Sequence, residues 1–541
     1  MLSGNNITKD WEGWRQIMVA EQLKVLQLED CPSLRKTPKF YAISQLERLI
    51  LRCSQLRKID KSVGNLQHLD YLEIMCEAIK SLPESIGDLK SLTELRILSH
   101  RISILPPSIG NLKDLKHLIL ECRELQKLPN SIGKLDSLLE LDVNGSNISQ
   151  LPRSIGKFER LKVLCVSNCG LEKLPRSIGR LQSLVKLDLS SSHIRILPKC
   201  IGNLKMLKVL NLENSRRISE IPKTIGMLKN LEELRAPYGD LEREIPSEIG
   251  ALSSLKILDL RDGRFRGLPT TINQLTNLQR LRLQGCDSIQ QLPELPKSLT
   301  HLAFSPVSLT AIPDCSNLTN LVDLWIVGES MQKPNIEGIL RLPALRKMTL
   351  LVGKMALPPT DFSSLSQLQR LKISCVEPQF LIGLPSSLQW LSLTDVRSPI
   401  DWLVFSNLEN LSRLLLCGYS LRELRFEALG ELRKLKHLYM VDCLWLKTLT
   451  LPPGLKEIRH LFLHKLPLLT DIQGLGELKS LQDLYIMTCN SIKSLNESDL
   501  SNLQNLKSLY LSVCDSLESV LGVPKSCKLI VIGCPKLNRD G

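Results

Sequence analysis

A leucine-bearing hexad, LxxLxL, recurs along almost the whole chain, and its spacing constrains the fold more than any other feature. We number the first residue of each hexad +0. In the first part of the chain eight successive intervals are each 23 residues long, with +0 residues at Leu23, Leu46, Leu69, Leu92, Leu115, Leu138, Leu161, Leu184 and Leu207. The pattern continues with small slips through Leu231, Leu255, Leu278, Leu299, Leu321, Leu345, Leu368, Leu388, Leu411, Leu435, Ile458, Leu481, Leu506 and Cys527, which gives 23 registers. Such a period indicates a stacked array of short repeats.

The repeat that begins at Leu184 shows how one coil is built. Leu187 and Leu189, at +3 and +5, lie on one face of a short strand and point inward, while +2, +4 and +6 point outward. Pro198 suits the first turn of a short helical segment that closes the coil. One coil cannot bury its leucines alone, so stacked coils must share a core. The sequence predicts an α/β leucine-rich repeat solenoid, a curved horseshoe with a parallel β-sheet on its concave face and short helical or irregular segments on its convex face.

The chain of 541 residues is too long for one globular core, which stops growing at roughly 250–300 residues, but a solenoid has no such ceiling. A regular LPxSIGxL segment recurs as far as about residue 293, after which intervals of 21 and 20 residues appear. We therefore predict an N-terminal capping segment at 1–22, a regular array at 23–293, and an irregular array at 294–541 that is continuous with the first. A separate second domain is the alternative.

The start of the chain resembles the tail of a repeat, with Leu2 at +5. Apolar coil edges need a cap. Either Trp11, Trp14 and Ile17 fold over this edge, or the chain is a fragment of a longer one, and the incomplete repeat favours the fragment.

Cysteine positions follow the repeat. Eleven of the sixteen cysteines fall at the strand exit, at +7 or +8: Cys31, Cys53, Cys76, Cys122, Cys169, Cys286, Cys375, Cys443, Cys489, Cys514 and Cys534. A buried cysteine there packs as a small hydrophobe and can donate weakly to the next coil's backbone. No paired CxxC spacing favours zinc. We expect reduced cysteines, which are typical of an intracellular protein.

Charge and motifs exclude several functions. The formal charge of +14 comes from 70 basic and 56 acidic residues that alternate along the chain, so no concentrated basic face for nucleic acid is predicted. No run of about 18 apolar residues suggests a membrane span, and no signal peptide is recognisable. A phosphate-binding GxxxxGK[ST] loop and a recognisable Ser/His/Asp arrangement are both missing from the sequence. We expect no enzyme activity, and we assign no catalytic, cofactor-binding or metal-ligating residue.

Candidate contact residues occupy the outward positions of the last repeats. Aromatic residues fill successive +4 positions there although the chain is only 4% aromatic. The candidates are Tyr439, Phe462, Tyr485 and Tyr510 at +4, His437 and His460 at +2, His464 at +6, and, further upstream, Trp325 at +4 and Trp390 at +2. The alternative is that these aromatics pack internally or against a C-terminal cap. In the first half the same columns carry charges of both signs, which is typical of a solvated face.

A resemblance to a known family rests on specific segments. They are NITKDWEGW at 6–14, LKVL at 23–26, CPSLRKTP at 31–38, LERLIL at 46–51 and the run of LPxSIG units. With these the chain resembles the leucine-rich repeat region of plant disease-resistance proteins of the TIR–nucleotide-binding–LRR type, most closely the flax L-type rust-resistance proteins. The family's NAD-hydrolysing TIR domain and its ADP/ATP-binding switch have no counterpart in this sequence.

The resemblance implies an effector-sensing and autoinhibitory module of an intracellular immune receptor, acting in plant defence and innate immune signalling. The implied partners are a pathogen effector or a guarded host protein, together with the TIR and nucleotide-binding domains of the same receptor. The implied location is cytoplasmic or nucleocytoplasmic. One alternative is a constitutive intracellular LRR scaffold of the Ras-pathway type, which shares the LPxSIGxL repeat. Another is an extracellular receptor ectodomain, which glycosylation and an export signal would identify.

Overall fold

The structure is a computed structural model that divides into two compact units, unit 1 at 1–298 and unit 2 at 299–541. It describes residues 1–4, 7–20, 22–41, 43–238, 244–305, 312–328, 336–352, 358–374, 376–398, 402–405, 407–420, 423–425 and 432–537.

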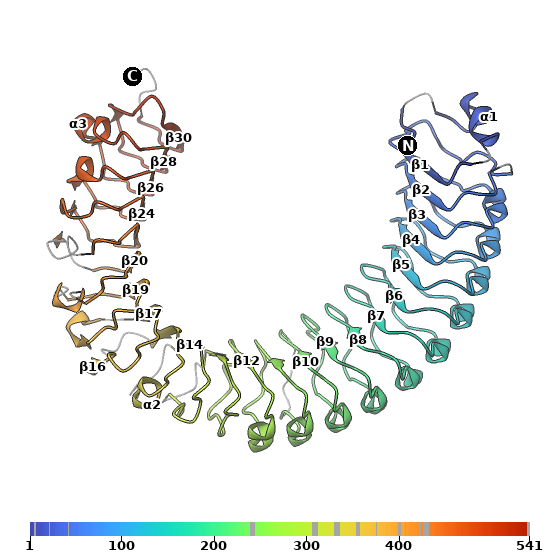
Figure 1. Ribbon diagram of the computed structural model, residues 1–541, viewed down its shortest axis with the longest axis horizontal. Coiled ribbons are helices and arrows are strands. Elements are labelled where there is room, and N and C mark those ends of the chain that lie inside the picture. The colour runs from blue at the N-terminus through green and yellow to red at the C-terminus, as the bar shows by residue number, and fades with distance from the viewer. Residues whose placement is uncertain are drawn as a thin grey trace. The chain divides into compact units, whose positions relative to one another are not determined.

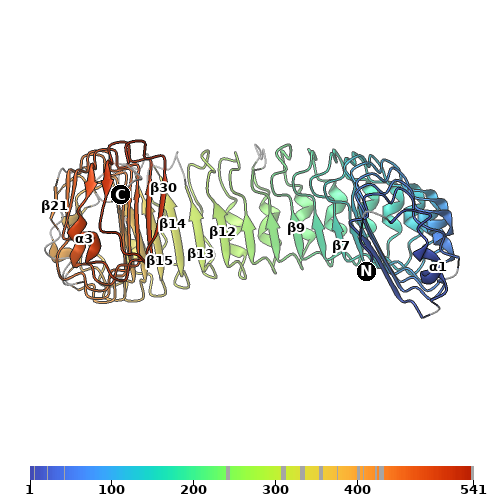
Figure 2. The same cartoon turned by 90° about the horizontal axis from the view of Figure 1, so that it is seen from above.

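Unit 1 is built on parallel strands that all begin at +2 of a repeat. Each strand pairs with those of the preceding and following repeats, and residues with the same repeat address face each other, as in Leu164 with Leu187 and Leu187 with Leu210. In Figure 2 the arrows of β7, β9 and β12 lie in one row and point the same way. The strands are β1 (Val25–Glu29), β2 (Arg48–Arg52), β3 (Tyr71–Met75), β4 (Glu94–Leu98), β5 (His117–Glu121), β6 (Glu140–Asp142), β7 (Val163–Cys165), β8 (Lys186–Asp188), β9 (Val209–Asn211), β10 (Glu233–Arg235), β11 (Ile257–Asp259) and β12 (Arg280–Leu283).

Short 3-10 helices close the coils of unit 1 on the side opposite the strands (Figure 1). In most coils the proline of the LPxSIG segment is the N-cap of the helix. Pro198, with φ −68° and ψ 145°, is therefore extended and lies just before the helix, one position earlier than the sequence predicts. The helices are η1 (Lys61–Asn65), η2 (Glu84–Asp88), η3 (Pro107–Asn111), η4 (Asn130–Lys134), η5 (Arg153–Lys157), η6 (Arg176–Arg180), η7 (Lys199–Asn203), η8 (Lys223–Met227), η9 (Ser247–Ala251) and η10 (Thr270–Gln274).

Glycine in these helical segments allows adjacent coils to stack closely. A Cβ atom added to Gly133 would lie 2.5 Å from the backbone oxygen of Ser154 in the next coil and 2.6 Å from the Ser154 Cβ. Both distances are well below van der Waals contact, so the helices approach closely only because this position has no side chain.

Unit 2 repeats the same strand geometry with less regular connections. Its main strands are β13 (His301–Phe304), β14 (Asp323–Val327), β15 (Lys347–Leu351), β17 (Arg370–Ser374), β19 (Trp390–Thr394), β20 (Arg413–Cys417), β22 (His437–Val441), β24 (His460–His464), β26 (Asp483–Met487), β28 (Ser508–Ser512) and β30 (Lys528–Ile532). Short helices lie at α2 (Glu337–Leu340), η11 (Pro378–Phe380), η12 (Trp402–Phe405), η14 (Leu475–Glu477) and α3 (Glu497–Ser501). Small parallel ladders join β16 (Thr360–Asp361) to β18 (Leu381–Ile382), β21 (Glu423–Arg425) to β23 (Thr448–Thr450) and β25 (Asp471–Gln473), and β27 (Ser494–Leu495) to β29 (Ser519–Val520).

The last register differs from the sequence prediction. Ser508, at +2, pairs with Lys528, so the final repeat starts at Ser526 and not at Cys527. Leu529 and Val531 therefore take the +3 and +5 addresses, although Leu529 is 44% exposed and Val531 is only half-buried. The run LIVI at 529–532 contains no polar residue that would fix the register by alternation.

The core follows the repeat address. In both units the +3 and +5 residues of the main strands are buried from Leu26 to Leu511, and Leu187 and Leu189 have no exposed surface. This confirms the predicted inward face and the predicted α/β repeat solenoid.

The strand-exit cysteines form hydrogen bonds between coils. Cys169 Sγ donates to the backbone oxygen of Val143 at 3.1 Å, and Cys286 Sγ donates to that of Leu260 at 3.1 Å. The acceptor belongs to the preceding coil, whereas the sequence predicts an acceptor in the next coil. All cysteines in the described part of the chain are free thiols, and Cys375 lies outside the described residues. Burial raises the pKa of the Cys286 thiol to about 12.

The N-terminal segment contacts the first strand. Leu2 forms a parallel bridge with Leu28, which is the partner that its predicted +5 address requires. Trp14, in α1 (Gly13–Met18), is buried, donates from Nε1 to the Thr8 oxygen at 2.7 Å, and packs edge-on against Trp11 at a centroid distance of 5.4 Å.

Candidate functional site

Seven of the nine candidate residues form one cluster on the outward face of unit 2, which we call the aromatic strip: His437, Tyr439, His460, Phe462, His464, Tyr485 and Tyr510. They project from β22, β24, β26 and β28, which pair in parallel and in register. All seven side chains are partly exposed, because the +3 and +5 neighbours of each strand occupy the core.

The rings of the strip contact one another across the strands. Centroid distances are 6.0 Å from Tyr439 to Phe462, 5.7 Å from Phe462 to Tyr485 and 5.8 Å from Tyr485 to Tyr510. The rings tilt by 41° to 53° relative to their neighbours, which is an ordinary geometry for aromatic pairs. The strip therefore presents a continuous, prearranged aromatic surface.

The histidines of the strip have defined partners. His437 stacks on His460 at 4.5 Å, and His460 Nδ1 lies 2.8 Å from an Asp483 carboxylate oxygen. Burial, with the nearby charges of His460 and Arg413, lowers the pKa of His437 to about 4. His437 is therefore an uncharged ring at neutral pH, and it extends the ring surface of the strip without adding charge.

The two tryptophans lie apart from the strip. Trp325 shares the +4 column, but Thr349, Lys372, Ser392 and Leu415 separate it from Tyr439. Trp390 lies in the +2 column, and Arg413 separates it from His437. The sequence placed both in the right columns but could not show that polar or aliphatic residues interrupt the aromatic run.

The structure adds neighbours that aromatic content alone does not reveal. Leu415 precedes Tyr439 in the +4 column and Ile530 follows Tyr510, while Met487 lies beside them at +6; all three are partly exposed. Trp445, two residues beyond the ladder position of Cys443, is 54% exposed. Its address, +10, is outside the columns that the period marks as outward.

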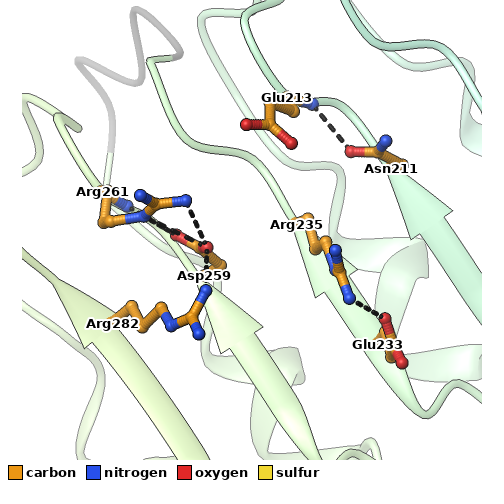
Figure 3. A network of polar contacts seen from close by, with 7 residues as sticks. All are labelled: Asn211, Glu213, Glu233, Arg235, Asp259, Arg261 and Arg282. Carbon is orange, nitrogen blue, oxygen red and sulfur yellow. Dashed lines mark hydrogen bonds and ion pairs between the residues drawn. The ribbon is translucent and has the colours of Figure 1, made fainter. Parts of the chain in front are cut away.

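Unit 1 carries a different, charged surface in the same columns (Figure 3). Asp259 is almost fully buried beneath two guanidinium groups, with Arg261 Nε at 2.9 Å and Arg282 Nη1 at 3.4 Å. Arg235 pairs with Glu233 within the same strand at 2.6 Å. The predicted solvated face thus holds at Arg235 and Glu233, whereas Asp259 is a buried anchor of the network.

A groove of about 1700 Å³ also lies in unit 1, along the side that carries the 3-10 helices. Four successive Leu-Pro or Ile-Pro steps line it, at residues 197–198, 221–222, 245–246 and 268–269. None of the described residues that line this groove is aromatic, so they offer none of the ring surface of the strip.

The described residues contain neither a metal-binding cluster nor a membrane-spanning helix. Within the described residues, no group of three histidine, cysteine or acidic side chains is arranged to hold a metal ion. No described helix combines the length and the apolar character needed to cross a membrane.

Comparisons with known proteins address the family. The profile of a family described as leucine-rich repeat region matches residues 3–123, 103–189, 161–245 and 238–450. A search of the curated proteins finds no match.

Solved structures with similar folds include plant and bacterial proteins. The plant peptide hormone receptor RGFR1, solved in complex with RGF2, is 23% identical, with 95% of this chain and 92% of that chain covered and a TM-score of 0.51. A TDR receptor is 20% identical, with coverage of 96% and 94% and a TM-score of 0.51. An LRR protein of Leptospira interrogans is 23% identical, with coverage of 81% and 99% and a TM-score of 0.49. At these identities the likeness to the RGFR1 and TDR receptors concerns the fold alone. Because the profile matches span 3–450 of 541 residues, the chain belongs to the leucine-rich repeat family.

Proposed function

We propose that this chain is a protein-recognition module, the effector-sensing and autoinhibitory leucine-rich repeat portion of an intracellular plant immune receptor, and that the aromatic strip is its contact surface. The observation that carries the recognition role is the strip itself. Large rings on four adjacent strands stay partly exposed in a chain with few aromatics. Rigid aromatic side chains are the residues that most often dominate protein–protein binding energy.

The immune assignment has a separate basis. It rests on the resemblance carried by NITKDWEGW at 6–14 and CPSLRKTP at 31–38, which matches plant TIR–nucleotide-binding–LRR proteins of the flax L type. Under this proposal the partners are a pathogen effector or a guarded host protein, and the location is cytoplasmic. The chain would divide into the capping segment 1–22, the regular array 23–293 and the irregular array 294–541.

The test uses a matched pair of triple variants. Tyr439→Ala, Phe462→Ala and Tyr485→Ala together remove the centre of the strip, while Thr349→Ala, Lys372→Ala and Ser392→Ala change the same +4 column upstream. Purified proteins are screened by biolayer interferometry against a panel of secreted pathogen effectors. We expect at least one effector to bind the wild type, and its affinity for the strip variant to be at least about a hundredfold lower, because hot-spot truncations cost about 2 kcal/mol or more each. The upstream variant should bind this effector as tightly as the wild type does. Unchanged binding by a correctly folded strip variant would refute the strip as the contact surface.

The alternative function is the constitutive intracellular scaffold. The regular LPxSIGxL coils with helices η1 to η10 favour it. Its distinguishing result is binding of a resident host protein through unit 1, which the strip variant leaves unchanged.

A further inference from the structure

The aromatic strip is bordered on one side by a row of positive charges. We call Arg413, Lys436, Arg459, Lys507 and Lys528 the cation row. Lys436, Arg459 and Lys507 lie at +1 of their repeats, while Arg413 and Lys528 lie at +2 at the two ends of the row. The backbones are hydrogen-bonded from coil to coil: Arg459 N donates to the Lys436 oxygen at 2.8 Å, and Lys528 N donates to the Lys507 oxygen at 2.8 Å. Gln482 fills the step between them, with its N donating to the Arg459 oxygen at 2.8 Å.

These cations lack acidic partners within the described part of the chain. Lys507 Nζ contacts only the Gln482 amide oxygen, at 3.4 Å, and no described carboxylate pairs with Arg413, Lys436, Arg459 or Lys528. The nearest carboxylate in the columns of the strip, Asp483, is held by His460. In unit 1, by contrast, Lys208 and Lys256 share Glu232 at 2.9 and 2.7 Å. The cation row is therefore a charged surface that no carboxylate among the described residues neutralises.

The spacing of the strip fits a helix. Successive ring centroids are 5.7 to 6.0 Å apart, close to the helical pitch of about 5.4 Å. A helix that lies along the strip, across the strands, would thus advance by about one turn per strand. Each turn would then place one apolar residue against the ring of one strand. The +1 and +4 positions are about 10 Å apart along an extended strand, comparable to the helix diameter of about 10–12 Å. Acidic residues on the flank of the same helix would reach the cation row.

We propose that the aromatic strip and the cation row together bind an acidic amphipathic α-helix of about twelve residues, with apolar residues at i, i+4, i+7 and i+11 and carboxylates along one flank. This inference rests on the proposed recognition role of the strip and adds the chemistry of the partner.

A single-stranded nucleic acid is the main competitor, since it also combines stacking with positive charge. The rings leave no space for an inserted base, however. A base between two rings requires about 7 Å, twice the contact distance of roughly 3.5 Å, whereas the rings of the strip already contact each other at 5.7 to 6.0 Å. The apolar neighbours Leu415, Met487 and Ile530 likewise favour aliphatic or aromatic side chains over phosphate and sugar.

The experiment is a selection from a phage-displayed library of 16-residue helical peptides with randomised surface positions, against the full chain. We expect the enriched peptides to be net negative with apolar residues at helical spacing. The inference would be overturned if the enriched peptides were neutral or basic, if they lacked this spacing, or if no peptide were enriched. A fluorescein-labelled dT20 oligonucleotide is titrated by anisotropy, and tighter binding of dT20 than of the selected peptides would also overturn it.

Matched charge reversals locate the binding. Lys436→Glu with Arg459→Glu alters the cation row, and Lys116→Glu with Lys162→Glu makes a similar charge change at the same +1 address in unit 1. We expect the first pair of substitutions to lower the affinity for the selected peptides about tenfold or more, given the typical strength of exposed charge pairs. The second pair should change this affinity by less than about twofold. If the strip alanines abolish binding but the Lys436 and Arg459 reversal does not, the acidic partner is wrong and the strip still binds. If neither changes binding, the strip is not the contact surface and the proposed function fails with it.

Discussion

Replacing Gly133 by alanine tests whether the coils of unit 1 are as tightly stacked as their geometry indicates. The new Cβ would lie 2.5 Å from the Ser154 backbone oxygen, whereas van der Waals contact requires roughly 3.5 Å, so the next coil must move by about 1 Å. A gap of this size forfeits about a quarter to a half of each dispersion contact. A buried side chain makes roughly 40–60 contacts of about 0.1–0.2 kcal/mol each. If about half of these face the next coil, Ile132 and Leu135 together lose about 3 kcal/mol at the middle of these ranges. Alanine also lowers the conformational entropy of the unfolded chain relative to glycine, which stabilises the folded state by about 0.4–1 kcal/mol. The net destabilisation is therefore about 1–3 kcal/mol.

The assay is urea unfolding, with hydrogen exchange followed over residues 130–157, because the loss should concentrate at one interface between coils. Gly267→Ala is the matched control, since its nearest neighbour, the Gln291 oxygen, lies at 3.7 Å. We expect this control to be unchanged or slightly stabilised. Equal stability and equal exchange protection in the Gly133 and Gly267 variants would show that the coils yield without loss and that the stacking argument is wrong.

Three further predictions concern the core, a titratable ring and the thiols. Leu187→Ala should lower the free energy of unfolding by about 2–5 kcal/mol through cavity formation, and an unchanged thermal transition would contradict the inward assignment of Leu187. His437 has a folded-state pKa of about 4, below the ordinary 6.5, so its stabilising contribution is complete above about pH 6.5 and declines as the pH falls toward 4; the unfolding midpoint of His437→Phe should fall less over that window than that of the wild type. Iodoacetamide at pH 8 should modify the partly exposed Cys527 well before the buried Cys286, as measured by peptide mass spectrometry, and equal rates would contradict the cysteine ladder.

The repeat period predicted most of the fold because one address fixes one environment. Val25 and Ser508 lie far apart in the sequence, yet both begin a strand at +2 and are followed by a buried residue at +3. The period failed at β30, where the run at 529–532 gives no alternation to set the register. It also could not predict the small ladders such as β21–β23–β25, since these short pairings depend on the path of the irregular connections.

The site was predictable as a set of columns but not as a surface. Register alone placed Tyr439, Phe462, Tyr485 and Tyr510 side by side, and the structure brings their rings into contact. Their role in binding stays a prediction. The exposure of Trp445 could not be found from the period, because its address, +10, lies outside the columns that the period marks as outward.

The hydrogen bonds between coils also bear on how the protein is made. The side-chain bond from Cys31 to Leu2 spans 29 residues, and most bonds between coils span 20 to 28. No such contact has to wait for a distant part of the chain, which is a condition for early folding. At a synthesis rate of roughly 5–20 residues per second, a ribosome would release a 23-residue coil every one to five seconds, roughly. Each coil could then settle on the one before it, so this chain is suited to assembling from its N-terminus while it is still being translated.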